Sequence, residues 1–208
     1  MSENVVMTIP IVTVSDITLP RWMTPFAKRL FAIPTHMTAT ERLTLFQTAL
    51  ALPAGFAALE VGSYLGASTA FLGFAALQRG GFVHAIDPWT NDAMGAEGVR
   101  DTWAEFRRNT EPFEHFIVPH QGTSAAVNAR EPQIPCDLLF IDGDHSYEAV
   151  RTDLTLWLPS LKAGGVLAMH DIDSPDVRRA FEELVGSRLS APPNVADRLL
   201  TCRPPVPA

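Results

Sequence analysis

The sequence predicts an α/β protein built on a doubly wound, mostly parallel sheet with helices on both faces. Three observations carry this prediction. From residue 56 onwards, apolar runs of strand length alternate with segments whose apolar residues recur at helical spacing. The connections between them are short, as in parallel sheets with crossover helices. Polar residues gather where the apolar runs end, which is the edge at which such sheets bind ligands.

The chain begins with residues 1–20, which are apolar and β-branched without a clear period and are interpreted as an arm or a frayed terminus. Thr38 followed by Glu41 is a capping-box pattern, and it predicts a helix at 39–51. Together, residues 1–52 are expected to form an N-terminal arm and helical cap.

The core is expected to span residues 53–190 and to contain five parallel strands. Apolar runs bounded by turn residues predict these strands at 56–61, 81–87, 114–119, 136–142 and 164–170. The helices between them follow from apolar spacing and capping residues, at 67–79, 98–109, 122–129, 146–158 and 175–186. Residues 191–208 are expected to form a final strand and a proline-rich tail within the same domain.

Composition excludes several classes of protein. A chain of 208 residues that is 47% apolar can bury one sizeable core. Its net charge of −7 and the lack of a basic run argue against a nucleic-acid partner. No apolar stretch is long enough for a membrane span, and no signal-peptide pattern begins the chain, so we expect a cytoplasmic protein without a membrane partner.

The most informative segment joins the first core strand to its helix through Glu60, Gly62 and Gly66. A strand that turns through glycines into a helix forms a nucleotide pocket, because glycine lets the backbone approach a ligand. The spacing E-x-G-x-x-x-G lacks the close glycine pair that a pyrophosphate needs and the lysine of a P-loop. Since Glu60 would repel a phosphate, the pocket suits a ligand with a cationic or neutral centre.

Further cofactor-binding candidates follow the next two strands. Asp87 is placed to accept both hydroxyls of a ribose, or else to cap a turn. Trp89 either stacks on an adenine or covers apolar surface. Gly122, Thr123 and Ser124 either hydrogen-bond an adenine edge or begin the next helix as N-cap residues, and both roles can hold at once.

Two neighbouring strand ends carry a cluster of acids and histidines. Asp142 and His145 follow one buried strand, and His170 and Asp171 follow the next. Because adjacent strands lie about 5 Å apart, Asp142 and Asp171 are expected to converge on one cation. Carboxylates with an added imidazole suit Mg²⁺ or Mn²⁺. The alternative is that these acids only cap helices and hold loops.

A metal at this position would orient a substrate hydroxyl and lower its pKa. His145 is near enough to take the proton and titrates in the useful range. Asp142 and His145 are therefore the candidate catalytic residues.

Together these motifs resemble class I S-adenosylmethionine-dependent methyltransferases. The closest group is that of small-molecule O-methyltransferases related to macrolide-sugar methyltransferases and cephalosporin hydroxylase-type proteins. The resemblance covers residues 55–187 and implies a Rossmann-like fold that binds S-adenosylmethionine. It assigns the methionine part of the cofactor to the first loop and its helix start: Glu60, Gly62, Ser63, Tyr64, Gly66, Ser68 and Thr69.

The same resemblance implies further roles. Asp87 would hold the cofactor ribose, and Asp142, His170 and Asp171 would ligate Mg²⁺. His145 matches the general base of the sugar methyltransferases.

The chain also departs from the family pattern. Members often place Glu-Asp where this chain has His170-Asp171. The family sheet closes with an antiparallel hairpin, and the few residues left here predict an abbreviated one with a strand at 197–202. Because no large insertion is present, the acceptor pocket is expected from the N-terminal segment, from the 89–100 loop or from another subunit of a homodimer or larger homo-oligomer.

The function expected is methyl transfer from S-adenosylmethionine to a hydroxyl of a small molecule. Sugars, phenols, hydroxy acids and peptides all remain compatible acceptors. One alternative is a nicotinamide-dependent oxidoreductase, against which the missing G-x-G-x-x-G argues. Another is a non-catalytic module or partner subunit that keeps the cofactor fold.

Overall fold

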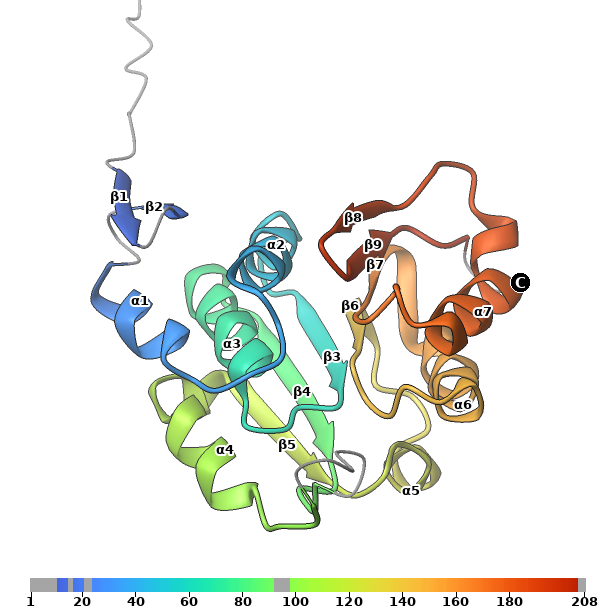
Figure 1. The fold of residues 1–208 in the computed structure, drawn as a ribbon, viewed down its shortest axis with the longest axis horizontal. Coiled ribbons are helices and arrows are strands. Elements are labelled where there is room, and N and C mark those ends of the chain that lie inside the picture. The colour runs from blue at the N-terminus through green and yellow to red at the C-terminus, as the bar shows by residue number, and fades with distance from the viewer. Residues whose placement is uncertain (1–10, 15–16, 21–23, 92–97, 206–208) are drawn as a thin grey trace, which may run out of the picture.

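The computed structural model describes residues 11–14, 17–20, 24–91 and 98–205. Its centre is a seven-stranded sheet in the order β5-β4-β3-β6-β7-β9-β8, in which β3 to β7 run parallel and β9 runs antiparallel to both of its neighbours, β7 and β8 (Figure 1). The strands are β3 (Ala57–Val61), β4 (Phe82–Asp87), β5 (Ile117–Gln121), β6 (Cys136–Ile141), β7 (Leu161–Met169), β8 (Asn194–Ala196) and β9 (Leu199–Cys202). The predicted fold class, with its abbreviated C-terminal hairpin, is confirmed.

Helices cover both faces of this sheet (Figure 1). One face packs against α1 (Thr24–Phe31), α2 (Ala39–Leu50), α3 (Ala67–Arg79) and α4 (Trp103–Thr110). The other packs against α5 (Ser124–Arg130), α6 (Tyr147–Trp157) and α7 (Pro175–Leu184). Short 3-10 helices lie at Glu111–Phe116, Leu158–Ser160 and Gly186–Arg188, and β1 (Ile11–Val14) pairs antiparallel with β2 (Ile17–Pro20) in a separate two-stranded sheet.

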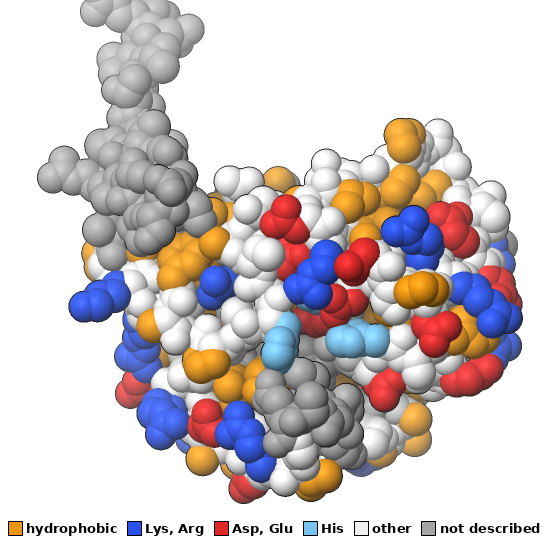
Figure 2. Space-filling model, in the orientation of Figure 1, with side chains coloured by type: hydrophobic (Ala, Val, Ile, Leu, Met, Phe, Trp, Pro, Cys, Tyr) orange, Lys and Arg blue, Asp and Glu red, His pale blue; other side chains and the backbone are white. Residues whose placement is uncertain are grey.

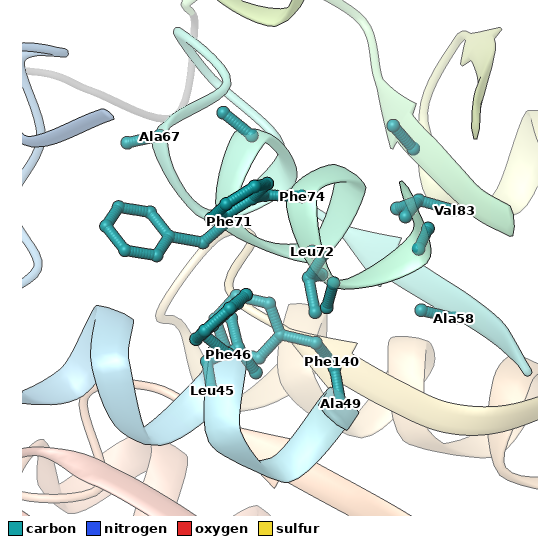
Figure 3. Packing of buried hydrophobic residues seen from close by; sticks show 14 of the residues in the cluster. Leu45, Phe46, Ala49, Ala58, Ala67, Phe71, Leu72, Phe74, Val83 and Phe140 are labelled. Atoms are coloured by element: carbon teal, nitrogen blue, oxygen red, sulfur yellow. The ribbon is translucent and has the colours of Figure 1, made fainter. Parts of the chain in front are cut away.

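Aromatic packing fixes α2 on α3. The rings of Phe46 and Phe74 stack with centroids 5.5 Å apart, and Phe71 meets Phe46 edge-on at 6.3 Å (Figure 3). Such pairs add to the free energy gained by burying the rings. At the start of α2, the predicted capping box is present, since Thr38 Oγ1 accepts from Glu41 N and Glu41 Oε2 accepts from Thr38 N. This packing holds the first turn of α2 above the carboxyl end of β7.

Several predicted boundaries are wrong for local reasons. The third core strand begins at Ile117 rather than at 114, because residues 111–116 form a 3-10 helix with Pro112 in its first turn. The helix expected from residue 98 also begins later, since α4 starts at Trp103, where Asp101 Oδ1 in the preceding loop accepts from Trp103 N. Part of the 89–100 loop expected beside the acceptor, residues 92–97, lies outside the described residues.

The C-terminal half shows similar shifts. The strand expected at 164–170 begins at Leu161, and it carries a register irregularity against β6. The strand expected at 197–202 begins at Leu199, because Asp197, with φ +53°, and Arg198 form the turn after β8. The sequence predicted no element at 24–31, where α1 lies. No helix in the described part of the chain has the length and apolarity needed to cross a membrane.

Candidate active site

A cavity of about 630 Å³ opens at the carboxyl ends of β3, β4, β5 and β6. This volume falls in the range of small-molecule and cofactor sites. Its wall includes Gly62, Asp87, Ser124, Asp142 and Asp153. The cavity therefore lies at the edge of the sheet where the sequence predicted a ligand site.

Acidic side chains dominate the charge of this cavity. The described residues that line it include five carboxylates and no lysine, arginine or histidine; the carboxylates belong to Asp87, Asp142, Asp144, Glu148 and Asp153. In a partly enclosed site, where charges are poorly screened, these groups oppose the binding of a phosphate. The cavity suits a ligand that brings cationic centres and hydrogen-bond donors.

Gly62 is required at the mouth of this cavity, but for a reason the sequence did not show. A Cβ built on Gly62 would lie 2.1 Å from the carbonyl oxygen of Asp142, and its φ is +88°. The expected close approach is thus made by the chain's own β6–α6 loop. Gly66, at φ +83°, is required for a similar reason, because a Cβ there would lie 2.7 Å from Thr110 Cγ2 and clash with it.

Gly62→Ala is expected to destabilise the protein by more than about 3 kcal/mol, because the added methyl overlaps the backbone of Asp142. Gly55→Ala is a matched control, because Gly55 has a similar φ of +77° with nothing within 4 Å of a built Cβ. Left-handed strain alone predicts a loss of about 1–2 kcal/mol there. Urea unfolding of both variants measures the difference. Equal losses would show that the close approach costs nothing.

Glu60 is completely buried behind the glycine loop and does not line the cavity. Its Oε2 accepts from Ser63 Oγ at 2.7 Å and from Thr69 Oγ1. Burial raises the pKa of Glu60 to about 7, against the opposing hydrogen bonds from these hydroxyls and from Ser68. The expectation that Glu60 meets a ligand directly is therefore corrected, since its side chain holds the loop from beneath.

The raised pKa of Glu60 makes stability depend on pH. Between pH 4.5 and about 7 the native state keeps the proton that the unfolded chain loses, so the free energy of unfolding falls as the pH rises, by up to about 3 kcal/mol. Glu60→Gln is expected to remove this fall, because the amide does not titrate. Urea unfolding of wild type and variant at pH 5 and pH 8 tests it, and parallel pH curves would contradict the assignment.

Asp87 fastens the loop to the end of β4. Its Oδ2 accepts from Ser63 N and Tyr64 N, both at 2.8 Å, and its Oδ1 accepts from Trp89 N at 2.6 Å. The turn-capping alternative is therefore present. Because Asp87 also lines the cavity, and a carboxylate has about four acceptor positions, its contact with a ribose stays a prediction.

Trp89 lies in the core and does not face the main cavity. Its side chain is 1% exposed, and its ring packs against Trp103 and Phe106 with centroids 4.5 and 4.6 Å away. The expected stacking of Trp89 on an adenine is therefore corrected to the alternative reading, in which the ring covers apolar surface.

The three residues after β5 were expected either to begin the next helix or to bind an adenine edge. Thr123 Oγ1 accepts from Ala126 N and is the N-cap of α5. Ser124 Oγ instead accepts from Trp157 Nε1 at 2.8 Å. Gly122, Thr123 and Ser124 all line the cavity, as the sequence predicted for an adenine edge.

A second, smaller cavity of about 80 Å³ links the glycine loop to the acid–histidine cluster. Gly62, Tyr64 and Asp142 line both cavities. The predicted residues Ser63 and Ser68 line the smaller one, whereas Thr69 is fully buried. The far wall comes from the segment between α1 and α2, with Thr35, His36 and Met37.

The acid–histidine cluster forms as the strand-end argument predicted. One ligand atom from each of Asp142, His170 and Asp171 lies within 4.8 Å of the others. His170 Nδ1 is 3.0 Å from Asp171 Oδ2 and 3.2 Å from Asp142 Oδ1. His145 Nε2 lies 3.0 Å from Asp171 Oδ2 and 3.9 Å from Asp142 Oδ1. Figure 2 shows acidic, basic and histidine side chains gathered near the middle of this face of the molecule.

Two residues of this network were missed by the sequence analysis. Glu41 is fully buried, and its Oε2 lies 3.0 Å from His170 Nε2. Arg198 donates from Nη1 to Asp171 Oδ1, and its backbone N donates to Glu41 Oε1 at 2.8 Å. Only the capping-box pattern singled out Glu41, and it gave no sign of this second role. No local signal marked Arg198.

The charges of this network fit a divalent cation. Hydrogen bonds to Asp142 and Asp171 raise the pKa of His145 to about 9. Burial lowers the pKa of His170, but the same two acids outweigh burial and raise it to about 11. The network holds three carboxylates, those of Glu41, Asp142 and Asp171, and one arginine, Arg198. Their negative charge must be balanced either by protons on the two histidines or by a metal ion. A metal-binding histidine usually gives its other N–H to a carboxylate, as His170 can to Glu41.

Comparison with known proteins agrees with this fold. A family model described as a methyltransferase domain matches residues 59–172, more than half of the 208-residue chain. The O-methyltransferase NovP has a similar fold, with a TM-score of 0.65 and 15% identity over 82% of each chain. The structure of CalS11, a TDP-rhamnose 3'-O-methyltransferase, is similar with a TM-score of 0.60 and 16% identity, over 90% of this chain and 96% of the other.

A third similar structure is an O-methyltransferase from Bacillus cereus in complex with S-adenosylhomocysteine. Its TM-score is 0.62 at 20% identity, over 86% of this chain and 89% of the other. At such identities the likeness shows the fold, whereas the family model shows the kind of domain. The chain belongs to the methyltransferase domain family, and the resemblance to class I methyltransferases is confirmed.

Proposed function

We propose that this protein transfers a methyl group from S-adenosylmethionine to a hydroxyl of a small molecule, assisted by Mg²⁺ or Mn²⁺ and by His145. The observation that carries the proposal is a cavity lined by carboxylates that meets the acid–histidine cluster at Asp142. A ligand in the larger cavity can thus present its reacting end to the cluster.

The cavity fits S-adenosylmethionine in charge and size. That cofactor carries a sulfonium and an ammonium group, which the carboxylates of the wall attract, and no phosphate, which they would oppose. When bound, it supplies an electrophilic methyl group. The chain's own task is to align the acceptor hydroxyl with that methyl and to exclude water. The loop from Gly62 to Ser68 and the ribose acceptor Asp87 would hold the cofactor.

The donor set of the cluster fits a divalent cation held by Asp142, His170 and Asp171. When bound, such an ion supplies electrostatic stabilisation of a deprotonated hydroxyl. His170 can offer Nδ1 to the ion while its Nε2–H donates to Glu41 Oε2. His145 is 45% exposed in its side chain and borders the smaller cavity. Its Nε2 donates to Asp171 Oδ2 at 3.0 Å, which leaves the other ring nitrogen, Nδ1, to take the acceptor proton. Asp171 would then stabilise the imidazolium.

An oxygen acceptor is supported by the hydroxyl-activating character of this cluster. The similar proteins NovP and CalS11 are O-methyltransferases, and CalS11 acts on a sugar nucleotide. Thr35, His36 and Met37 border the smaller cavity, so the segment before α2 is placed to form part of the acceptor wall. A second subunit of a homo-oligomer would complete it. We place the enzyme in the cytoplasm, with no nucleic acid as partner.

The test of this proposal is methyl transfer itself. The purified chain is incubated with S-adenosylmethionine, Mg²⁺ and sugar, phenol, hydroxy-acid or peptide acceptors, and S-adenosylhomocysteine is quantified. We expect turnover with at least one acceptor class and its loss on addition of EDTA, restored by excess Mg²⁺ or Mn²⁺. If EDTA leaves turnover intact, the proposed role of a divalent metal ion is wrong. Tight S-adenosylhomocysteine binding without turnover on any acceptor would favour the non-catalytic module.

A further inference from the structure

The main cavity holds a buried carboxylate that the proposed function does not yet use. Asp153 lies on α6, is 5% exposed, and forms part of the cavity wall. Burying a charged group without partners is costly, so an acid in this position calls for hydrogen-bond donors. The question is which donors the chain supplies and which it leaves to a ligand.

The chain supplies one hydroxyl. Trp157 Nε1 donates to Ser124 Oγ at 2.8 Å, which leaves the Ser124 hydroxyl proton to be donated to Asp153. Burial raises the pKa of Asp153 to about 6 in spite of this bond, and the nearby charge of Asp144 adds to the rise. No lysine or arginine of the described chain is placed to offset it. At pH 7.5 the group is therefore an anion with spare acceptor positions.

The position of Asp153 within the cavity indicates which part of a cofactor it meets. The strands end in the order β5, β4, β3, β6, so Asp87 lies between the glycine loop after β3 and the end of β5. A nucleoside held with its sulfur near the loop and its ribose near Asp87 extends its base toward the start of α5, where Ser124 is the hydrogen-bond partner of Asp153. There Ser124 and Asp153 form the wall.

We propose that Asp153, supported by Ser124, accepts a hydrogen bond from the 6-amino group of the cofactor's adenine and selects 6-aminopurine over 6-oxopurine ligands. This inference rests on the proposed function. A 6-oxopurine would turn an acceptor oxygen toward the carboxylate, leaving two acceptors face to face. Sites built to hydrogen-bond a substrate group discriminate strongly against analogues that lack it, because their buried polar atoms lose their partner.

The experiment is calorimetric titration of the full chain at pH 7.5 with S-adenosylhomocysteine and S-inosylhomocysteine. We expect the wild type to prefer the adenosyl ligand by about 100-fold or more. Asp153→Asn is expected to reduce this ratio at least tenfold, because an amide can donate to the 6-oxygen. Glu148→Gln removes a charge from the same cavity wall and the same helix, but at an exposed position. Any loss of affinity then applies to both ligands alike, so their ratio should stay within about twofold of wild type.

Each outcome separates this inference from the proposed function. If the wild type binds neither ligand, the proposed function fails. If it binds both equally, or if Asp153→Asn keeps the full preference, the role of Asp153 is overturned while the function stands. Should Asp153→Asn fail to fold, the wild type is titrated with the 6-unsubstituted purine analogue. Binding of that analogue as tight as S-adenosylhomocysteine would equally overturn the proposal.

Discussion

Asp171→Asn is expected to reduce methyl transfer by at least 100-fold and to abolish Mn²⁺ binding at the cluster. Asp171 joins three groups, since its Oδ2 lies 3.0 Å from both His145 Nε2 and His170 Nδ1, and its Oδ1 accepts from Arg198. Contacts to the two histidines hold the pKa of Asp171 well below its usual range, although burial opposes this. An amide in its place offers a much weaker metal ligand and leaves His170 and Arg198 short of negative charge.

The variant tests function only if its fold survives. Removing one member of a buried ionic group typically costs about 3–5 kcal/mol, so thermal unfolding must accompany the assay. Asp173→Asn is the matched control, because Asp173 is an exposed acid two residues further along the chain. Mn²⁺ binding is followed by electron paramagnetic resonance. If a folded Asp171→Asn protein keeps both Mn²⁺ binding and turnover, the acid–histidine cluster is neither the metal site nor needed for methyl transfer.

His145→Ala is expected to cut methyl transfer at least tenfold while the affinity for S-adenosylhomocysteine stays within about twofold, because a positioned general base contributes about 10²–10⁴-fold. His145 does not line the larger cavity, but it borders the smaller one and reaches Asp171 and Asp142. The rise of kcat/KM with pH that the imidazole imposes on the wild type should be lost in the variant.

The control for this substitution is His115→Ala, at an exposed histidine that lines neither cavity. It should leave both turnover and its pH profile unchanged. If His145→Ala retains full turnover, the proton is taken by another group. If it loses turnover and ligand affinity together, His145 acts in binding rather than in proton transfer.

The sequence was sufficient to predict the fold and the acid cluster. Strand–helix alternation dictates the parallel sheet, and parallel strands place their ends side by side, so Asp142 and Asp171 had to come together. The same reasoning predicted a ligand site at this edge, where the cavity lies beside Gly62. These predictions held because each depends on local patterns and on one general property of parallel sheets.

What the sequence missed depends on contacts between distant segments. Arg198 reaches Asp171 only because the turn between β8 and β9 folds beside β7. Trp89 follows a strand end like the other candidates, yet α4 brings Trp103 against it and buries it. Gly62 meets the chain's own Asp142 backbone. No pattern within either segment encodes such a contact.

The central claim is that the acid-lined cavity binds the S-adenosyl nucleoside of the cofactor and excludes a dinucleotide. Calorimetric titration of the purified chain with S-adenosylhomocysteine, with and without Mg²⁺ and with NAD as the control, tests it without knowledge of the acceptor. We predict micromolar binding of S-adenosylhomocysteine and no binding of NAD, whose phosphates would face the carboxylates of the cavity. Binding of NAD in place of S-adenosylhomocysteine, or of neither ligand under either metal condition, would contradict the account.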